Sequence, residues 1–407
     1  MILVPEITPK MLDLFGSALP WRVLRTLQKA PLKAMVYADD AAAPSCCVVR
    51  IGREIYCGGD LTPERFASIR DRILIFEVYE KFGTFRLNLR ALNRSGRAPD
   101  ELDVLHAVRQ HLPDAESASR VPRGQSTYVY RVKTPTGTCY ARFLPEDASF
   151  AAEVTAHRLM DAANVRVPRV IAFEHREKTS GRSMMLSEEI PGASMEEAWP
   201  ERGAADILRE AGRQLALIHT IPVDGFGWID RRSHDALKGE KGSFPEYFDD
   251  YLPDDLICLR HYGFSGSDQA RVRDYMGQAR RALDIPQAVL VHGDFDTTHI
   301  FHASGRFTGF IDFGEIRGSN PLFDLGTFAY NDRSPDREAY CHLIEGYREV
   351  ACLTKDDLYA IELMALFILL RYAGKKVVQV DKKPQTDHWY HLIKKQLKRM
   401  EGFKSCL

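Results

Sequence analysis

Hydrophobic and polar positions alternate along a strand-rich block between residues 121 and 192. The stretch VPRGQSTYVYRVKTPTGTCYARFLP (121–145) has the period of two that is typical of strands, and it predicts a pair of strands joined at residues 134–137. Helical periods precede it in ELDVLHAVRQHL (101–112) and follow it in SFAAEVTAHRLMDAA (149–163). Two further runs, PRVIAFE (168–174) and SMMLSEEIPG (183–192), predict two more strands.

Helical periodicity dominates beyond residue 191. Five stretches predict helices: 204–221, 252–262, 267–284, 335–351 and 356–373. Strand signals return only near residues 288–313, where Ala288–Val291 and residues 307–311 are short apolar runs, and HASGR (302–306) is predicted to form the turn between them. A strand-rich block followed by a helix-rich block predicts an α+β fold with two lobes.

Residues 1–98 have a different pattern. LKAMVYADD (32–40) and CCVVRIGREIYC (46–57) predict strands, with a hairpin turn at Gly52 and Arg53. Residues 61–82 predict a helix, because Thr62 is a suitable N-cap and Pro63 suits the first helical position. NRSGRAPDE (93–101) predicts a linker. We therefore expect a small α+β domain without assigned chemistry at 1–98, a strand-rich lobe at 99–190 and a helical lobe at 191–407.

The overall composition indicates a folded protein without a strongly charged partner. Apolar residues make up 45% and charged residues 27% of the 407 residues, and the formal net charge is −1. A charge this close to zero predicts neither a nucleic acid nor a membrane as partner. The 8 cysteines lack zinc-site spacing, and residues 1–16 lack the pattern of a secretion signal. We expect a cytoplasmic location.

Polar residues crowd between two apolar positions in VHGDFDTTHI (291–300). Asp294 lies 18 residues before Asp312, which ends the second of the two short strands predicted above. If these strands pair, the two carboxylates approach each other. One carboxylate can then orient a nucleophile, while the other holds a hard cation through oxygen.

Four motifs in order resemble the aminoglycoside phosphotransferase family, whose fold is protein-kinase-like. They are LALIH (215–219), HGDFDTTH (292–299, here named the catalytic loop), IDFGE (311–315, here named the metal turn) and GSNPLFDLGTF (318–328). The resemblance covers about residues 101–375 and implies an ATP-dependent kinase, a phosphotransferase with an alcohol group as acceptor. GTP stays open as an alternative donor.

The resemblance also implies roles for individual residues. Asp294 would be the catalytic carboxylate that accepts or orients the substrate hydroxyl, and Asp312 would bind Mg²⁺. His292 would brace the catalytic loop, and Asp324 would hold it in place. The segment Gly124, Gln125, Ser126 and Thr127 would cover the phosphates with backbone N–H groups. Ser187, Glu188 and Ile190 would belong to the hinge that contacts the purine.

Two positions depart from the family pattern. Arg142 stands where kinases usually place a lysine that grips phosphates, and Glu153 on the next helix is its expected ion-pair partner. His299 stands where the family motif has asparagine. An imidazole can bind a metal, but Mg²⁺ prefers oxygen, so His299 is a candidate ligand, and Asp296, water or a single-metal arrangement are alternatives.

Several functional alternatives remain open from the sequence. A catalytically weak nucleotide-binding relative, with residues 1–98 carrying the biological role, would also fit the two departures. A protein kinase is disfavoured, because no APE segment or long activation loop follows the metal turn. Acidic residues in 245–255 and 332–362 favour a small polycationic substrate, although each acid alone is typical of a solvated helix face. The acceptor and the oligomeric state stay open.

Overall fold

The computed structural model describes residues 2–4, 7–14, 34–51, 54–59, 98–122, 127–144, 148–200, 202–231, 233–234, 236–376 and 388–404. The chain forms two compact units. One consists of Met1–Leu87, Phe248–Ala279 and Leu366–Leu407, and the other consists of Asn88–Tyr247 and Arg280–Ala365. These units cut across the domain boundaries expected from the sequence, which remain a prediction.

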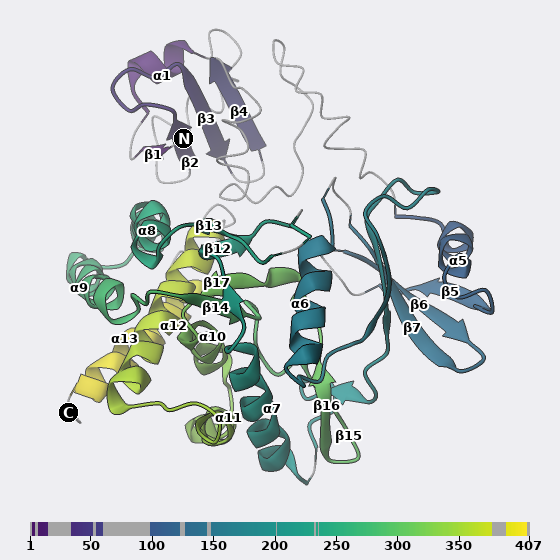
Figure 1. Ribbon diagram of the computed structural model, residues 1–407. Helices are drawn as coiled ribbons and strands as arrows, with labels where there is room; N and C mark the ends of the chain where they lie inside the picture. Colours follow the sequence, from purple (N-terminus) through teal and green to yellow (C-terminus); the bar gives the residue numbers. More distant parts are fainter. Residues whose placement is uncertain are drawn as a thin grey trace. The chain divides into compact units, whose positions relative to one another are not determined.

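The N-terminal residues form a four-stranded antiparallel sheet in the order β1-β2-β3-β4 (Figure 1). Its elements are β1 (Ile2–Val4), α1 (Pro9–Asp13), β2 (Ala34–Ala38), β3 (Cys46–Ile51) and β4 (Glu54–Gly59). The expected strands are present, and Ile51 pairs with Glu54 as a hairpin requires. Met11 of α1 packs with Val36 and Val49 of the sheet. The helix expected at 61–82 and most of the linker lie outside the described residues.

The strand-rich lobe is a five-stranded antiparallel sheet in the order β5-β6-β7-β9-β8 (Figure 1). Its strands are β5 (Ser117–Arg120), β6 (Tyr128–Thr134), β7 (Gly137–Phe143), β8 (Val170–Glu174) and β9 (Met184–Glu188). The four strands predicted from the sequence are confirmed. β5 was missed because its residues, SASR, offer one apolar side chain, Ala118, and hence no visible alternation.

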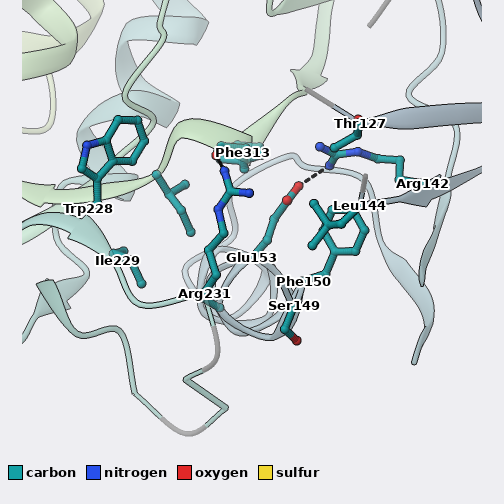
Figure 2. A pocket seen from close by; sticks show the side chains of 13 residues that line it. Thr127, Arg142, Leu144, Ser149, Phe150, Glu153, Trp228, Ile229, Arg231 and Phe313 are labelled. Carbon is teal, nitrogen blue, oxygen red and sulfur yellow. Dashed lines mark hydrogen bonds and ion pairs between the residues drawn. The ribbon is translucent and has the colours of Figure 1, made fainter. Parts of the chain in front are cut away.

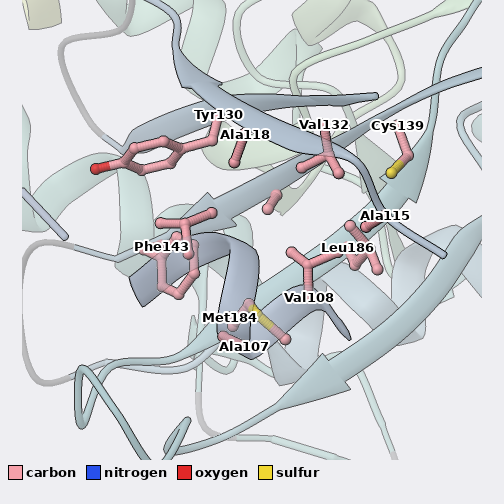
Figure 3. Packing of buried hydrophobic residues seen from close by; sticks show 12 residues of the cluster. Ala107, Val108, Ala115, Ala118, Tyr130, Val132, Cys139, Phe143, Met184 and Leu186 are labelled. Carbon is pink, nitrogen blue, oxygen red and sulfur yellow. The ribbon is translucent and has the colours of Figure 1, made fainter. Parts of the chain in front are cut away.

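Two helices cover opposite faces of this sheet (Figure 1). α5 (Glu101–Arg109) starts at Asp100, whose carboxylate accepts the backbone N–H of Leu102 at 3.0 Å. Side chains of α5 and of one sheet face point toward one another in a shared core (Figure 3). α6 (Ala151–Ala162) lies on the other face, where Phe150 and Met185 pack together. Because successive strand residues alternate between faces, Arg142 in β7 lies on the α6 face.

The helices α7 (Ala204–Ile218) and α11 (Glu338–Arg348) of the helical lobe pack in close contact. A Cβ atom on Gly212 of α7 would lie 2.1 Å from the carbonyl oxygen of Leu343, and one on Gly346 of α11 would lie 1.8 Å from that of Arg209. Glycine is therefore required on both helices. The other helical elements here are α10 (Leu322–Asn331), the 3₁₀ turn η5 (Pro335–Arg337) and α12 (Lys355–Lys376).

Two small sheets correct the strand pairing that the sequence suggested. β14 (Ala288–Val291) does not pair with β16 (Arg306–Phe310); the HASGR turn instead joins β15 (Ile300–Ala303) to β16, in a sheet of order β10-β15-β16. β14 lies in a second sheet of order β11-β14-β17-β12-β13. The remaining strands are β10 (Ala193–Ser194), β11 (Pro222–Val223), β12 (Phe226–Ile229), β13 (Gly239–Lys241) and β17 (Arg317–Ser319). These strands are too short for their periodicity to be recognised.

The remaining helices of the described residues are α8 (Phe244–His261), α9 (Gly266–Ala282) and α13 (His388–Lys404). α8 begins eight residues earlier than predicted, because Phe244, Tyr247 and Phe248 already bury one helical face. The helix continues through Pro253. Asp255 of α8, one of the acids expected to attract a substrate, is buried 3.6 Å from Arg371. Among the helices of the described residues, none is both long and apolar enough to cross a membrane.

Candidate active site

The catalytic loop leaves the end of β14 through a glycine that no other residue can replace. Gly293 has φ +88°, and a Cβ atom there would lie 1.9 Å from the carbonyl oxygen of Glu315. The catalytic loop therefore runs directly against the metal turn. The expected proximity of the two acidic segments is thus achieved through backbone packing, although β14 and β16 belong to different sheets.

Asp324 of α10 holds the start of the catalytic loop. Its carboxylate accepts the backbone N–H groups of His292 at 2.7 Å and Gly293 at 2.9 Å, and Nε2–H of His219 at 3.1 Å. The side chain is fully buried. Burial alone would raise the pKa of Asp324, but the hydrogen bond and charge of His219 hold it below the ordinary value. The residue thus remains a charged acceptor, as the scaffolding role expected from the sequence requires.

His292 fixes the catalytic loop to the metal turn. Burial lowers its pKa, so the ring is neutral, and Nε2–H donates to the carbonyl oxygen of Ile311 at 2.9 Å. Its ring lies 4.8 Å from the ring of Phe313 and 5.1 Å from that of His299. The hydrogen bond and these ring contacts join the two segments, as the bracing role expected of His292 requires.

Asp294 is the carboxylate that the loop presents, and it is partly buried. Burial is the largest cause that raises its pKa, to about 6; His299 opposes the rise, while the negative charges of Asp296, Glu315 and Asp312 add to it. The carboxylate consequently exchanges its proton near neutral pH. A group with this property can accept or donate a proton in a reaction.

The raised pKa of Asp294 makes a testable prediction about stability. Because the group titrates near 3.8 in the unfolded chain and at about 6 in the folded one, its favourable contribution is complete below about pH 4 and is lost as the pH rises through 6. Asp294→Asn should therefore raise the free energy of unfolding by up to about 3 kcal/mol at pH 8, and by much less at pH 4.5. Urea unfolding in chelator-treated buffer measures both values.

A matched control separates this effect from the loss of any carboxylate. Asp284→Asn removes an exposed aspartate from the same unit of the chain. We expect a change below about 0.5 kcal/mol for this variant. A gain for Asp294→Asn that is the same at both pH values would contradict the assigned cause.

Asp312 begins the metal turn in an unusual backbone conformation. Its φ is +64°, in the left-handed region that costs a non-glycine residue about 1–3 kcal/mol, and the 3₁₀ turn η4 (Phe313–Glu315) follows. The side chain is 50% exposed. Burial raises the pKa of Asp312, but Arg142, His299 and His292 together lower it below the ordinary value. The strained backbone thus presents an ionised carboxylate.

His299, the candidate metal ligand, faces this carboxylate. Its Nε2 lies 3.9 Å from Asp312 Oδ2, and its Nδ1 lies 3.5 Å from Asp296 Oδ1. Within the described residues, Nδ1 of His299 is buried without a hydrogen-bond partner. Asp296 in turn accepts from the backbone N–H and the hydroxyl of Thr298. Asp312 and His299 therefore lie side by side as two candidate ligands of one metal ion.

Arg142 and Glu153 form the expected ion pair between β7 and α6 (Figure 2). Both side chains are buried, with 12% and 9% exposed. A second guanidinium nitrogen of Arg142 lies 3.5 Å from Asp312 Oδ1. Arg142 therefore connects the strand-rich lobe to the metal turn.

A cavity adjoins this ion pair (Figure 2). Its empty volume, which includes space open to solvent, is about 470 Å³. Its lining combines polar groups with an apolar wall. The polar part contains Thr127, Arg142, Glu153 and Arg231. Arg231 donates to the carbonyl oxygen of Gly314 at 3.3 Å. Residues of both lobes thus converge on the metal turn.

Other predicted site residues lie elsewhere around β9. Ser187 is buried opposite Tyr140 of β7, and Glu188 ends β9, where its carboxylate binds Arg169. Ile190 follows in the connection to β10, and its side chain approaches Gly309 of β16. The hinge role of these residues stays a prediction. Gly124, Gln125 and Ser126 lie outside the described residues, so of that segment only Thr127 is placed.

The phosphotransferase enzyme family model (APH) matches residues 117–357 of the chain. The chain belongs to this family. The aminoglycoside 3'-phosphotransferase of Streptomyces ribosidificus is 26% identical over 209 residues, which are 50% of this chain and 74% of the relative. The homoserine kinase of Phenylobacterium zucineum (strain HLK1) is 28% identical over 198 residues, which are 47% and 56% of the two chains.

Solved structures share the fold. A thermostable mutant of aminoglycoside phosphotransferase APH(4)-Ia, in a ternary complex with ADP and hygromycin B, matches with a TM-score of 0.53 at 13% identity, covering 74% of this chain and 97% of that one. A putative fructosamine-3-kinase from Thermobifida fusca matches with a TM-score of 0.52 at 18% identity, covering 74% and 98%. The two-lobed kinase-like fold, the suspected family and the predicted class of enzyme, a phosphotransferase, are confirmed.

Sequence reasoning missed three residues of this candidate site. Arg231 approaches Gly314 only through the fold, so no spacing in the sequence could have indicated it. Glu315 lies in the metal turn itself but was given no role, and its charge raises the pKa of Asp294. His157 was detectable, because it follows Glu153 by four residues and shares its helix face. Its Nδ1–H donates to the carbonyl oxygen of Pro168 at 2.9 Å, and burial lowers its pKa to about 4. A neutral His157 therefore packs beside the ion pair.

Proposed function

We propose that this phosphotransferase moves the γ-phosphoryl group of ATP, or of GTP, to a hydroxyl group of a small molecule. The observation that carries the proposal is a set of contacts and charge interactions around the metal turn. Arg142 lies 3.5 Å from Asp312, which lies 3.9 Å from His299. The charge of Asp312 raises the pKa of Asp294, and His299 lowers it. A phosphate-binding cation, a metal-binding acid and a titratable carboxylate thus meet at one place.

The residues present fit a magnesium ion at Asp312. The carboxylate is ionised and half exposed, and the nitrogen of His299 that faces it, Nε2, lies 3.9 Å from Asp312 Oδ2. Within the described residues, no three His, Cys, Asp or Glu side chains could enclose a metal alone. Mg²⁺ suits such a site, since it usually takes one or two protein ligands and completes its shell with phosphates and water. When bound, it would neutralise phosphate charge.

The mechanism assigns each step to residues of this chain. Arg142 grips phosphate oxygens, and Glu153 keeps its guanidinium oriented. Asp294 accepts a hydrogen bond from the acceptor hydroxyl and holds its oxygen in line with the phosphorus. The new bond joins that oxygen to the γ-phosphorus as the bond to the β-phosphate oxygen breaks. The nucleoside diphosphate leaves, and the hydroxyl proton passes to Asp294.

An amine-bearing alcohol is the proposed class of acceptor. Asp296, Glu315 and Asp312 all add negative potential at Asp294. A cationic group on the acceptor would be attracted to this potential, which raises the local concentration of such substrates. The enzymes that the chain resembles include aminoglycoside 3'-phosphotransferases, which agrees with this class. In this proposal residues 99–190 and 191–407 are the two lobes, and residues 1–98 have no assigned role.

The test is a screen of nucleoside diphosphate release with ATP or GTP, with and without Mg²⁺, over matched amine-bearing and neutral alcohols. Asp294→Asn is the blank. We expect Mg²⁺-dependent turnover that is faster with amine-bearing alcohols and about 10³-fold slower in the blank. Nucleotide binding without turnover on any alcohol would instead support the catalytically weak relative. Turnover at the wild-type rate in the blank would reject the assigned mechanism.

A further inference from the structure

The cavity beside the metal turn contains a guanidinium for which the proposed mechanism has no role. We propose that Arg231, supplied by the helical lobe, grips the phosphoryl group while it is transferred. This inference rests on the proposed function, and it adds a second phosphate-binding arginine to Arg142. The two arginines reach the metal turn from different lobes, as Figure 2 shows for their side chains around the cavity.

The strand before Arg231 is anchored to the strand that follows the metal turn. Trp228 of β12 pairs with Arg317 of β17, and the guanidinium of Arg317 lies 4.0 Å from the centre of the Trp228 ring. β17 begins two residues after η4 ends. Arg231 follows the end of β12 by two residues, and its guanidinium donates to the Gly314 carbonyl oxygen at 3.3 Å.

The chain after Arg231 is anchored to the helix that carries Glu153. The hydroxyl of Thr155 in α6 donates to the carbonyl oxygen of His234 at 2.9 Å. The ring of His234 also lies 6.2 Å from the rings of Phe173 and His175. Contacts thus anchor the chain in β12, before Arg231, and at His234, three residues after it. This preorganisation lowers the entropy cost of contacting a ligand.

Two guanidinia line the cavity, and both can contact an anion. Among the described lining residues the ionisable groups are Arg142, Arg231 and Glu153, and Glu153 is already bound to Arg142. Trp228, Ile229, Phe150 and Ile316 supply apolar wall, which excludes water and strengthens a charge interaction. A guanidinium offers five N–H donors in a planar fork that matches phosphate oxygens.

The position of Arg231 fits a contact with the phosphoryl group that is transferred. A Cβ atom on Gly314 would lie 3.4 Å from Asp312 Oδ1 and 3.7 Å from Arg142 Nη2, while the Gly314 carbonyl oxygen binds Arg231. The two guanidinia therefore flank one peptide unit. Negative charge spreads over the transferred phosphoryl oxygens, and a guanidinium on them raises phosphoryl-transfer rates by about 10³–10⁵-fold in enzymes that use one.

The experiment compares binding of ADP and of AMP-PNP, which retains the third phosphate, by calorimetry. Wild type, Arg231→Ala, Arg231→Lys and Arg209→Ala are compared; Arg209 is a control arginine on α7 that binds Glu345. We expect Arg231→Ala to bind ADP within about twofold of wild type, to bind AMP-PNP roughly tenfold more weakly, and to lose about 10²-fold or more in kcat. Arg231→Lys should fall between, and Arg209→Ala should match wild type.

Each outcome decides between alternatives. If Arg231→Ala weakens the binding of ADP and of AMP-PNP equally, or changes the binding of neither, then Arg231 only supports the metal turn and the inference is wrong. Retained ADP binding also shows that the variant is folded. If wild type binds neither nucleotide, the proposed function falls and the inference with it. If wild type binds and turns over, and Arg231→Ala does the same at equal rates, the inference alone falls.

Discussion

Replacing Asp294 by asparagine is expected to lower the rate of phosphoryl transfer by about 10³-fold while nucleotide binding is retained. Asparagine has nearly the same shape but cannot take the hydroxyl proton. Its amide also removes the negative charge that the fold concentrates at this point, next to Asp296, Glu315 and Asp312. Single-turnover rates on the best acceptor of the screen measure the first effect, and calorimetric titration with ADP measures the second.

The pH dependence of wild type provides an independent check of the same residue. Because the pKa of Asp294 is raised to about 6, the carboxylate form increases as the pH rises from 5 to 7, and kcat should increase with it. Mg²⁺ at Asp312 would move this rise to lower pH. The residual rate of Asp294→Asn should lack the rise. A variant that keeps the wild-type profile would contradict the assignment.

Asp294 can have this role because the metal turn is not free to move. β17 starts directly after η4 and pairs with β14 and β12, so the chain on both sides of the turn is hydrogen-bonded in sheets. Asp324 and His292 tie the catalytic loop to the same place. Hydrogen bonds within the described residues therefore position the catalytic loop and the metal turn against each other.

Much of this site could be predicted because its motifs are local in the sequence. The catalytic loop and the metal turn each contain their reactive residue within a few positions. The resemblance to the family implied the ion pair of Arg142 and Glu153, and the regular periods of β7 and α6 identified the strand and the helix that carry the two residues. Where the pattern was long and regular, strand and helix were identified correctly.

The failures have physical reasons. The pairing of β14 was wrong because a four-residue strand carries no information about its neighbour, and that choice is made by tertiary packing. Asp255 was expected to attract substrate, but it is buried against Arg371. The two residues are more than a hundred positions apart, so the sequence offers no sign of their contact. Arg231 reaches the site only through a long-range contact with Gly314. Such residues can be recognised in coordinates and not in a single sequence.

Replacing one partner of the buried pair Arg142 and Glu153 should both destabilise the protein and stop the reaction. Arg142→Met leaves Glu153 buried without its cation, and Glu153→Leu leaves Arg142 without its main anion. Each variant should lose about 3–5 kcal/mol of unfolding free energy, the usual cost of an uncompensated buried charge. Each should also lose at least about 10²-fold in kcat/KM, because the phosphate-binding guanidinium is absent or misplaced.

The double variant Arg142→Met/Glu153→Leu separates stability from chemistry. Two apolar side chains of similar size leave no charge buried, so stability should return to within about 2 kcal/mol of wild type, even though Asp312 loses its contact with Arg142. Activity should not return. Urea unfolding and initial rates of the four proteins form a complete cycle. A double variant as unstable as the sum of the single variants would show that the pair is not coupled, and recovered turnover would show that Arg142 does not contact phosphate.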